Sequence, residues 1–272
     1  MATDFKLTLI SRDLAVIKAA DAAGIDRIGI DIERLGKRER QGHLGTRISD
    51  HELEDLRVVA ANVKHADVFI RVNPLHSGTR AEVERAIVLG ATVMMLPYFT
   101  TAREVAAYVD MVAGRATVVL LLETAAAAAR LHELVAVPGI AEILVGLNDL
   151  HLSMKLASHF EILASDLMIA IARVVRDAGL EFGFGGLGRP GDTALPVPPE
   201  LVYAQYPRLA ARSAWIARSF FSTATRPLDI GAEIARVRAE LDHWFAQPPA
   251  VLAEKHEELR RLVRSLVGRS AS

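Results

Sequence analysis

Short apolar segments alternate with longer amphipathic segments along most of the chain. The short segments are rich in Val, Ile and Leu, as strands buried on both faces of a parallel sheet are. In the longer segments apolar residues recur every three or four positions, which is typical of helices with one buried face. The pattern predicts eight strand and helix alternations. Strands are expected at 6–10, 27–31, 68–72 and 92–97, in two apolar runs between 117 and 149, after Glu181, and at 213–220.

This alternation predicts an α/β fold, a (β/α)8 TIM barrel. The chain has 272 residues, and such barrels commonly take about 250 as one domain. We therefore expect residues 1–246 to form the barrel and residues 247–272, after the QPP break, to form an additional C-terminal helix. A doubly wound open sheet is the alternative, because periodicity does not report whether a sheet closes.

The predicted C-terminal helix has an apolar face that exceeds what a barrel needs. We expect this face to pack on a partner subunit, and packing back onto its own barrel is the equal alternative. Its leucines at helical spacing are Leu252, Leu259, Leu262 and Leu266.

Two apolar runs each lead to a carboxylate, Glu123 and Asp149. The helix-like segment 125–135 lies between them, so the order is strand, helix, strand, and the two strands are expected to be parallel neighbours. Their C-terminal ends then meet at one edge, where barrels place their chemistry. Two acidic oxygen ligands there suit a hard divalent cation, Mg²⁺ or Mn²⁺. The alternative is that both acids only cap helices.

Arg71 ends the third predicted strand and is expected to project into the same mouth. Its rigid guanidinium fork suits a carboxylate or a developing enolate. An ion pair with Glu123 or Asp149 is the alternative, and both can hold together. A polar loop of about twenty residues follows Asp31, and loops of that length in compact domains are usually functional or mobile.

A second candidate binding stretch is the glycine-rich GFGGLGR after the predicted seventh strand. Barrels often bind phosphate at this position through backbone N–H groups. Close packing of helix on strand is the equal alternative. Arg189 and Arg218 are expected to bind a carboxylate or phosphate, or else to form surface ion pairs. His76 and His151 flank the predicted mouth and are weaker acid/base candidates.

The composition of the chain limits the kinds of ligand and chemical site that it can have. The formal net charge is −1, which gives no long-range attraction to nucleic acid or acidic membranes, so a small-molecule substrate is expected. The chain contains no cysteine, which excludes disulfides, thiolate metal sites and cysteine nucleophiles. The first residues lack the hydrophobic region of a signal peptide, and no apolar run reaches the roughly 18 residues that span a bilayer. A soluble cytoplasmic protein is expected.

Two stretches, RVNPLHSGTRAEVERAIVLGATVMMLP and LLLETAAAAARLHELVAVPGIAEILVGLNDLHLS, resemble the hydroxy-oxo-acid aldolase and citrate lyase beta-subunit family. This HpcH/HpaI family belongs to the phosphoenolpyruvate/pyruvate-binding barrels. The resemblance covers roughly residues 6–190. It rests on Arg71, on Glu123-Thr124 and on the turn Gly146-Leu147-Asn148-Asp149-Leu150. By resemblance, Glu123 and Asp149 bind the metal and Arg71 binds the oxo-acid.

The same resemblance places the carboxylate of a pyruvate-like substrate against the backbone of Gly146, Leu147 and Asn148, where glycine allows close approach. Two departures from the family pattern stand out. Leu147 replaces the usual proline of the turn. The family's Asp-x-Glu-His stretch reads Asp31-Ile32-Glu33-Arg34, so its acid/base histidine is absent.

Three loop residues are candidates for the role of the absent histidine. His43 or His51 can replace it as the acid/base, or Arg34 can bind an anion at that place. For each of the three, an exposed loop residue is the alternative.

The sequence thus predicts a class II type, metal-dependent carbon–carbon lyase that forms or uses a pyruvate-like enolate from a 2-oxo acid. One alternative is a citrate-synthase-like or citryl-lyase-like reaction on an acyl-CoA, with Lys37, Arg38 and Arg40 on the CoA phosphates. Another is a non-catalytic barrel that binds an oxo-acid. The family commonly exchanges C-terminal helices, so the resemblance also implies a homo-oligomer, a trimer or hexamer.

Overall fold

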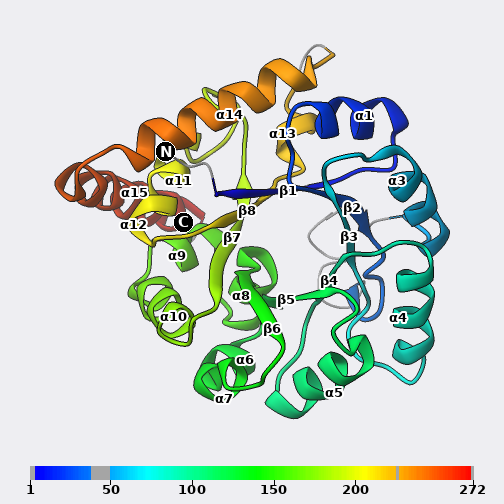
Figure 1. The fold of residues 1–272 in the computed structure, drawn as a ribbon. Coiled ribbons are helices and arrows are strands. Elements are labelled where there is room, and N and C mark those ends of the chain that lie inside the picture. Colours follow the sequence, from blue (N-terminus) through cyan, green and yellow to red (C-terminus); the bar gives the residue numbers. More distant parts are fainter. Residues whose placement is uncertain (1–3, 38–49, 225–226, 271–272) are drawn as a thin grey trace.

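The eight predicted strands close into a parallel barrel in the order β1 to β8, with β8 paired to β1 (Figure 1). The computed structural model describes residues 4–37, 50–224 and 227–270. The (β/α)8 prediction is confirmed, and the open sheet is excluded because the first and last strands pair. The strands are β1 Lys6–Ile10, β2 Arg27–Asp31, β3 Asp67–Arg71, β4 Val93–Leu96, β5 Thr117–Leu122, β6 Ile140–Val145, β7 Glu181–Leu187 and β8 Ser213–Ile216.

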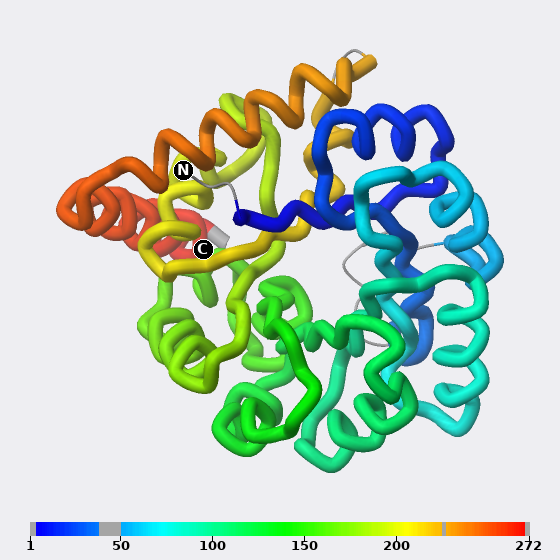
Figure 2. Tube along the Cα trace, viewed as in Figure 1, coloured from blue at the N-terminus to red at the C-terminus, as the bar shows by residue number. Residues whose placement is uncertain are grey.

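Helices cover the outside of the barrel, and the tube in Figure 2 shows the chain running once around it. The predicted helical segment 125–135 is divided at Arg130 into α6 and α7. Between β6 and β7, a capping box of Ser158 and Glu161 begins α9, and Ser165 precedes α10. The described helices up to β7 are α1 Leu14–Ala22, η2 Leu53–Asp55, α3 Leu56–Asn62, α4 Thr79–Val88, α5 Ala102–Val112, α6 Ala125–Ala129, α7 Leu131–Val135, α8 Leu147–Ser153, α9 His159–Leu163 and α10 Asp166–Asp177. After β7 come α11 Pro199–Tyr203, α12 Gln205–Arg208, α13 Ser219–Ser222, α14 Ile230–Phe245 and α15 Pro249–Ser270.

Strand alternation divides the apolar residues into two groups. One group faces outward and packs against the helices, and the other fills the barrel. The interior group is a small layer at mid-height, consisting of Phe69, Val93, Met95, Val119, Leu121 and Leu144. Charged residues occupy the inward positions above and below this layer. Since Asp31 pairs in register with Arg71 on the next strand, both stand at the C-terminal mouth.

The tail helix α15 packs against α9, α11 and α12 of its own chain. Leu252 and Leu259, two of the residues expected to face a partner, are buried in this packing at 7% and 0% exposure. For these two leucines the alternative of packing on the own barrel is therefore correct. Assembly into a homo-oligomer stays a prediction. None of the described helices is long and apolar enough to cross a membrane.

Candidate active site

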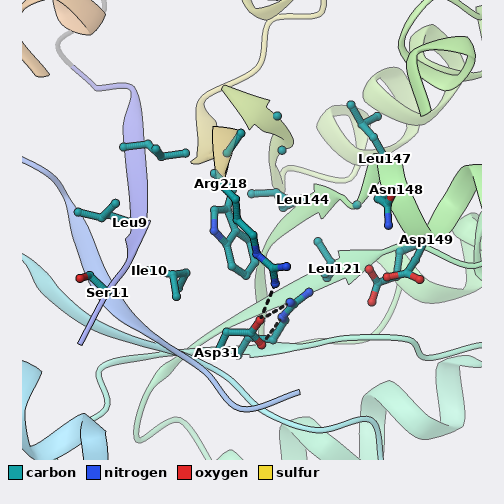
Figure 3. Close-up of a pocket in the computed structure, with 18 of the residues that line it drawn as sticks. Leu9, Ile10, Ser11, Asp31, Leu121, Leu144, Leu147, Asn148, Asp149 and Arg218 are labelled. Atoms are coloured by element: carbon teal, nitrogen blue, oxygen red, sulfur yellow. Dashed lines mark hydrogen bonds and ion pairs between the residues drawn. The ribbon is translucent and has the colours of Figure 1, made fainter. Parts of the chain in front are cut away.

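A cavity of about 840 Å³ opens at the C-terminal mouth of the barrel. Figure 3 shows Leu9, Ile10 and Ser11 on one side of it, and Leu147, Asn148 and Asp149 on the opposite side. Asp31 and Arg218 lie between these two walls, joined by a dashed line. The cavity floor is the apolar mid-layer, so the ligand space begins where the polar residues at the strand ends start.

Glu123 and Asp149 both line this cavity and are 2% and 5% exposed. Glu123 follows β5 directly, and its Oε1 accepts a hydrogen bond of 3.1 Å from the Tyr98 backbone N–H. Asp149 does not close a strand as the sequence indicated. It lies in the first turn of α8, because β6 ends at Val145. The structure thus brings both carboxylates to one mouth by two different routes.

The two carboxylates are close enough to affect each other's charge. Burial raises the pKa of Glu123 well above its ordinary value, and the negative charges of Glu33 and Asp149 raise it further. Arg71 and Lys37 act in the opposite direction. These surroundings therefore disfavour the ionised form of Glu123, and a cation bound beside it would stabilise that form.

Gly146 makes the room for Glu123. A Cβ at this position would lie 2.8 Å from Glu123 Oε2 and 2.9 Å from its Cβ. The backbone of Gly146 therefore approaches the carboxylate closely, as only glycine permits. Leu147 and Asn148 also line the cavity, so the turn expected to bind a substrate carboxylate borders the ligand space.

Arg71 is held by Asp31 and Glu33. Its Nε donates to Asp31 Oδ1 at 2.8 Å and its Nη2 to Asp31 Oδ2 at 2.6 Å, while Nη1 lies 3.1 Å from Glu33 Oε2. The guanidinium also covers the Trp215 ring at 4.8 Å. The alternative, an ion pair of Arg71 with Glu123 or Asp149, is replaced by this one, because β2 neighbours β3 in the barrel and β5 does not.

The bidentate contact fixes the plane of the guanidinium. Burial favours a lower pKa for Arg71, but Asp31 and Glu33 raise it above the ordinary value, so Arg71 stays charged. Conversely, burial favours a higher pKa for Asp31, while Arg71 and Lys37 hold it well below the usual range. The three contacts engage at most three of the five N–H groups, so Arg71 can still donate into the cavity.

Lys37 is a cavity residue that the sequence assigned to another role. It was expected to bind CoA phosphates, yet it is 2% exposed and its Nζ donates to Glu33 Oε2 at 2.9 Å. It also lies 3.6 Å from Asp31 Oδ2. Arg38 and Arg40, named for the same role, lie outside the described residues. The signal for the observed pairing was the spacing of four residues between Glu33 and Lys37.

Among the described residues the mouth holds more buried carboxyl groups than buried cations, four against two. Glu123 and Asp149 would supply hard oxygen donors for a divalent cation there. No group of three or more His, Asp or Glu in the described ranges forms a metal cluster, so the pair would leave positions open for substrate and water. The carboxylates are Asp31, Glu33, Glu123 and Asp149, and the cations are Arg71 and Lys37.

The candidates for the absent family histidine have different positions. His51 lines the cavity, and its Nδ1 accepts a hydrogen bond of 3.1 Å from the Asp31 backbone N–H. Arg34 does not line it: its Nη2 donates to the His51 carbonyl at 2.8 Å and lies 2.9 Å from Glu52. His43 lies outside the described residues. The sequence missed His159, which lines the cavity from α9 and whose pKa burial lowers to about 4.

The remaining candidate binding residues also differ in whether they line the cavity. Arg189 does not line the cavity and pairs with Asp192 at 2.8 Å and with the Thr223 hydroxyl at 2.9 Å. Of the glycine-rich stretch, Gly185 and Gly186 border the cavity. Arg218 lines it, with a side chain that is 53% exposed.

The fold and this mouth define a class of protein, a (β/α)8 barrel with paired carboxylates and a fixed arginine at its C-terminal end. A model of the HpcH/HpaI aldolase/citrate lyase family matches residues 9–184, so the chain belongs to that family of aldolase-type and citrate-lyase-type carbon–carbon lyases. No protein of curated function matches the chain by sequence.

Solved structures have the same fold at low identity. A HpcH/HpaI aldolase/citrate lyase family protein from Burkholderia cenocepacia is 17% identical, with a TM-score of 0.62 over 88% of this chain and 94% of its own. The citrate lyase beta subunit from M. tuberculosis, complexed with oxaloacetate and magnesium, is 15% identical, with a TM-score of 0.61 over 88% and 98%. The citrate synthase SbnG is 16% identical, with a TM-score of 0.61 over 88% and 95%.

Proposed function

We propose that the protein is a divalent-metal-dependent lyase of the aldolase type, which makes or breaks a C–C bond next to a pyruvate-like enolate. The observation that carries the proposal is that two buried carboxyl groups, Glu123 and Asp149, line one cavity beside a fixed arginine. Mg²⁺ is the first choice of cation, because magnesium is bound in the M. tuberculosis citrate lyase beta subunit. When bound, the cation polarises the keto oxygen of a 2-oxo acid.

The chain's own residues perform the other tasks. The backbone at Gly146, Leu147 and Asn148 borders the space for the substrate carboxylate. Arg71 places a fixed positive charge beside the developing enolate oxygen, and it needs no reorganisation because Asp31 already holds it. The apolar floor excludes water from below.

His51 is assigned to hydrogen-bond donation. Its Nδ1 lone pair accepts the Asp31 N–H, so the neutral ring carries its proton on Nε2. Burial lowers the pKa of His51, which favours this neutral form. We assign it to donate to the oxygen of the second reactant. The acid/base role expected for His43 stays a prediction.

A test of the proposal is exchange of the pyruvate methyl protons for deuterium, followed by NMR with and without Mg²⁺. The wild type should exchange only with the metal. Glu123→Gln and Asp149→Asn should each lower the exchange rate by about a thousandfold, because the polarising cation supplies several kcal/mol. Full exchange in both variants would rule out the metal role of the pair.

The two alternatives predict different outcomes of this assay. A non-catalytic barrel would bind oxalate with Mg²⁺ but exchange no protons. A condensing enzyme would release CoA from acetyl-CoA in the presence of an oxo-acid. The likeness to the citrate synthase SbnG keeps the second alternative open to test. The condensing alternative predicted that Lys37 binds CoA phosphates, but Lys37 donates a hydrogen bond to Glu33.

A further inference from the structure

The side of the cavity opposite the carboxylate pair is formed by the end of β8 and the segment that follows it. Glu123 follows β5, and in a closed eight-stranded barrel β1, the neighbour of β8, lies opposite β5. Residues 216–218 and Phe221 line this side. If a pyruvate-like enolate binds at Glu123 and Asp149 as proposed above, the space for the second reactant lies here. The position of the segment after β8 therefore determines how that reactant fits.

Three polar side chains, called here the rim clasp, connect this segment to the loop after β7. They are Arg189, Asp192 and Thr223. Arg189 Nη2 donates to Asp192 Oδ2 at 2.8 Å and to the Thr223 hydroxyl at 2.9 Å. The same hydroxyl donates to Asp192 Oδ2. Since hydrogen bonds to ionised groups are stronger than those between neutral groups, the rim clasp is a strong connection between the two loops.

Asp192 is buried although its neighbours in the chain are not. Its side chain is 4% exposed, while Gly191 and residues 193–194 are exposed. Its Oδ1 accepts a hydrogen bond of 3.0 Å from the Ala194 backbone N–H, so both of its oxygens are engaged. Burial favours a higher pKa for Asp192, but its hydrogen bonds, from the Thr223 hydroxyl first, hold the pKa below its ordinary value. The carboxyl group is therefore ionised at neutral pH, and its partners offset the cost of burying it.

The loop after β7 is itself anchored to the helices outside the barrel. The Gly188 carbonyl accepts a hydrogen bond of 3.0 Å from the buried Tyr203 hydroxyl of α11. The Pro190 carbonyl accepts one of 3.0 Å from Arg236 of α14. The rim clasp thus joins Thr223, at the end of α13, to a loop that is already fixed.

We propose that Asp192 is a positioning residue for the second reactant, because through the rim clasp it fixes the segment 216–223 against the loop after β7. This inference rests on the proposed function. At one end of the segment the Ala217 N–H donates to the last carbonyl of β7 at 2.8 Å, and at the other end the rim clasp holds Thr223. Phe221 lies between these two points and is held as a wall of the cavity.

This role also accounts for Arg189. The sequence predicts that it binds a substrate carboxylate or phosphate, but it does not line the cavity. In the rim clasp it acts on the second reactant only through Asp192 and Thr223.

The experiment uses the full chain with Mg²⁺, pyruvate and three neutral probe aldehydes: propanal, glycolaldehyde and glyceraldehyde. Kinetic constants are measured with the aldehyde that the wild type adds fastest. Asp192→Asn keeps the size of the side chain but cannot accept hydrogen bonds from all three donors, and Thr223→Val removes the hydroxyl at constant volume. Both should raise the KM for the aldehyde by about tenfold and leave kcat within about threefold, because the wall moves but no reacting group is lost.

Two comparisons show whether the effect is confined to the second reactant. Thr223→Ser keeps the hydroxyl and should stay within about twofold of the wild type. Exchange of the pyruvate methyl protons needs no aldehyde, so it should stay within about twofold in all three variants.

A second readout does not depend on turnover. The chain has two tryptophans, so in a Trp244→Phe background Trp215 is the single one. Trp215 lies on β8 and lines the cavity next to residues 216–218. Quenching of its fluorescence by acrylamide should increase by about twofold on Asp192→Asn, because a loosened segment opens more often to the quencher.

The matched control is Asp26→Asn at the N-terminal end of the barrel. Asp26 Oδ2 accepts hydrogen bonds from the Leu7 N–H at 2.7 Å and from Arg238 Nη2 at 2.6 Å, so the same carboxylate is lost from another arginine contact. This variant should change neither the KM for the aldehyde nor the quenching.

Four outcomes would overturn the inference. They are an unchanged KM or unchanged quenching in Asp192→Asn, a loss of pyruvate exchange as large as the loss of aldehyde addition, the same effect in Asp26→Asn or Thr223→Ser, and a wild type that exchanges pyruvate protons but adds none of the three aldehydes. A wild type that exchanges no pyruvate protons refutes the proposed function instead. Unchanged quenching alone then refutes the rim clasp separately.

Discussion

The barrel contains buried charges at both ends, and the two ends differ in balance. At the N-terminal end Arg27 Nη1 lies 2.6 Å from Glu142 Oε2, with 3% and 0% side-chain exposure, and the Ser213 hydroxyl donates to Glu142. One positive charge faces one negative charge. At the C-terminal mouth the buried carboxylates among the described residues outnumber the cations by two. Strand β2 contributes to both ends, through Arg27 and Asp31.

A balanced buried pair and an unbalanced cluster have different consequences. In a balanced pair, the attraction between the two charges offsets the free-energy cost of their desolvation. Such a pair affects the stability of the fold and leaves no charge for a ligand. An unbalanced cluster keeps like charges together at a cost in stability, and a ligand of opposite charge can remove that cost. We therefore assign the N-terminal end to stability and the mouth to binding.

The largest expected effect is a difference in stability when the same Glu→Gln substitution is made at each end of the barrel. Glu142→Gln should lower the free energy of unfolding by about 3 to 4 kcal/mol, because Arg27 would remain as a buried unpaired charge. Glu123→Gln should not lower the stability of the metal-free protein, and a gain of about 1 kcal/mol is expected from the lost repulsion with Asp149 and Glu33. Urea unfolding measures both.

A double variant controls for the first effect. Arg27→Met with Glu142→Met replaces the pair by apolar groups of similar volume, and should recover most of the lost stability. Equal destabilisation by Glu142→Gln and Glu123→Gln would remove the distinction between the two ends.

The sequence predicts the balanced and the unbalanced end unequally well. Strand order and the strand-end positions of Asp31, Arg71 and Glu123 follow from periodicity, because a parallel sheet brings these ends together. Arg27 with Glu142 is a contact between strands distant in the chain, and no local pattern reports it. The alternative considered for Arg71 was an ion pair with Glu123 or Asp149, whereas its partner is Asp31, because β2 and β3 are neighbours in the barrel.

Other misses have a similar physical cause. The burial of Lys37 depends on where the loop after β2 turns, which spacing alone does not give. The position of His159 depends on how α9 is placed after α8, which apolar periodicity does not report. Asp149 was placed at a strand end, although β6 stops at Val145 and a helix begins in the GLNDL turn.

The second expected effect tests whether a ligand removes the cost at the mouth. Mg²⁺ at about 100 times its Kd should raise the free energy of unfolding of the wild type by about 2.7 kcal/mol. Asp149→Asn should show little of this increase, while the double variant at Arg27 and Glu142 should keep it. Thermal melts across a Mg²⁺ titration measure the effect. An equal shift in Asp149→Asn would place the ion elsewhere.

The third expected effect comes from a buried histidine outside the mouth. His256 on α15 is 7% exposed, with Nδ1 3.1 Å from Gln205 Oε1. Burial, then Arg208 and Arg260, lower its pKa to about 4, and Glu257 and Asp166 act in the opposite direction.

Because the folded pKa of His256 lies below the unfolded one, its contribution is complete above about pH 6.5 and is lost as the pH falls toward 4. Stability should fall by about 2 kcal/mol between pH 7 and pH 5 from this group. His256→Asn keeps a side-chain donor but does not titrate, so its unfolding free energy should change less across the same range. Parallel slopes for the two proteins would show that His256 does not contribute.

The smallest expected effect concerns the geometry of the mouth. Gly146→Ala keeps every charge but places a Cβ 2.8 Å from Glu123 Oε2, so the carboxylate must move by several tenths of an ångström. Mg²⁺ affinity should fall by about tenfold, which corresponds to about 1.4 kcal/mol. Gly185→Ala is the matched change on β7, where the added Cβ would lie 3.9 Å from Trp215, and it should keep the metal affinity. Calorimetric titration compares them. If both variants bind Mg²⁺ like the wild type, the mouth binds the cation by charge alone and the position of Glu123 is unimportant.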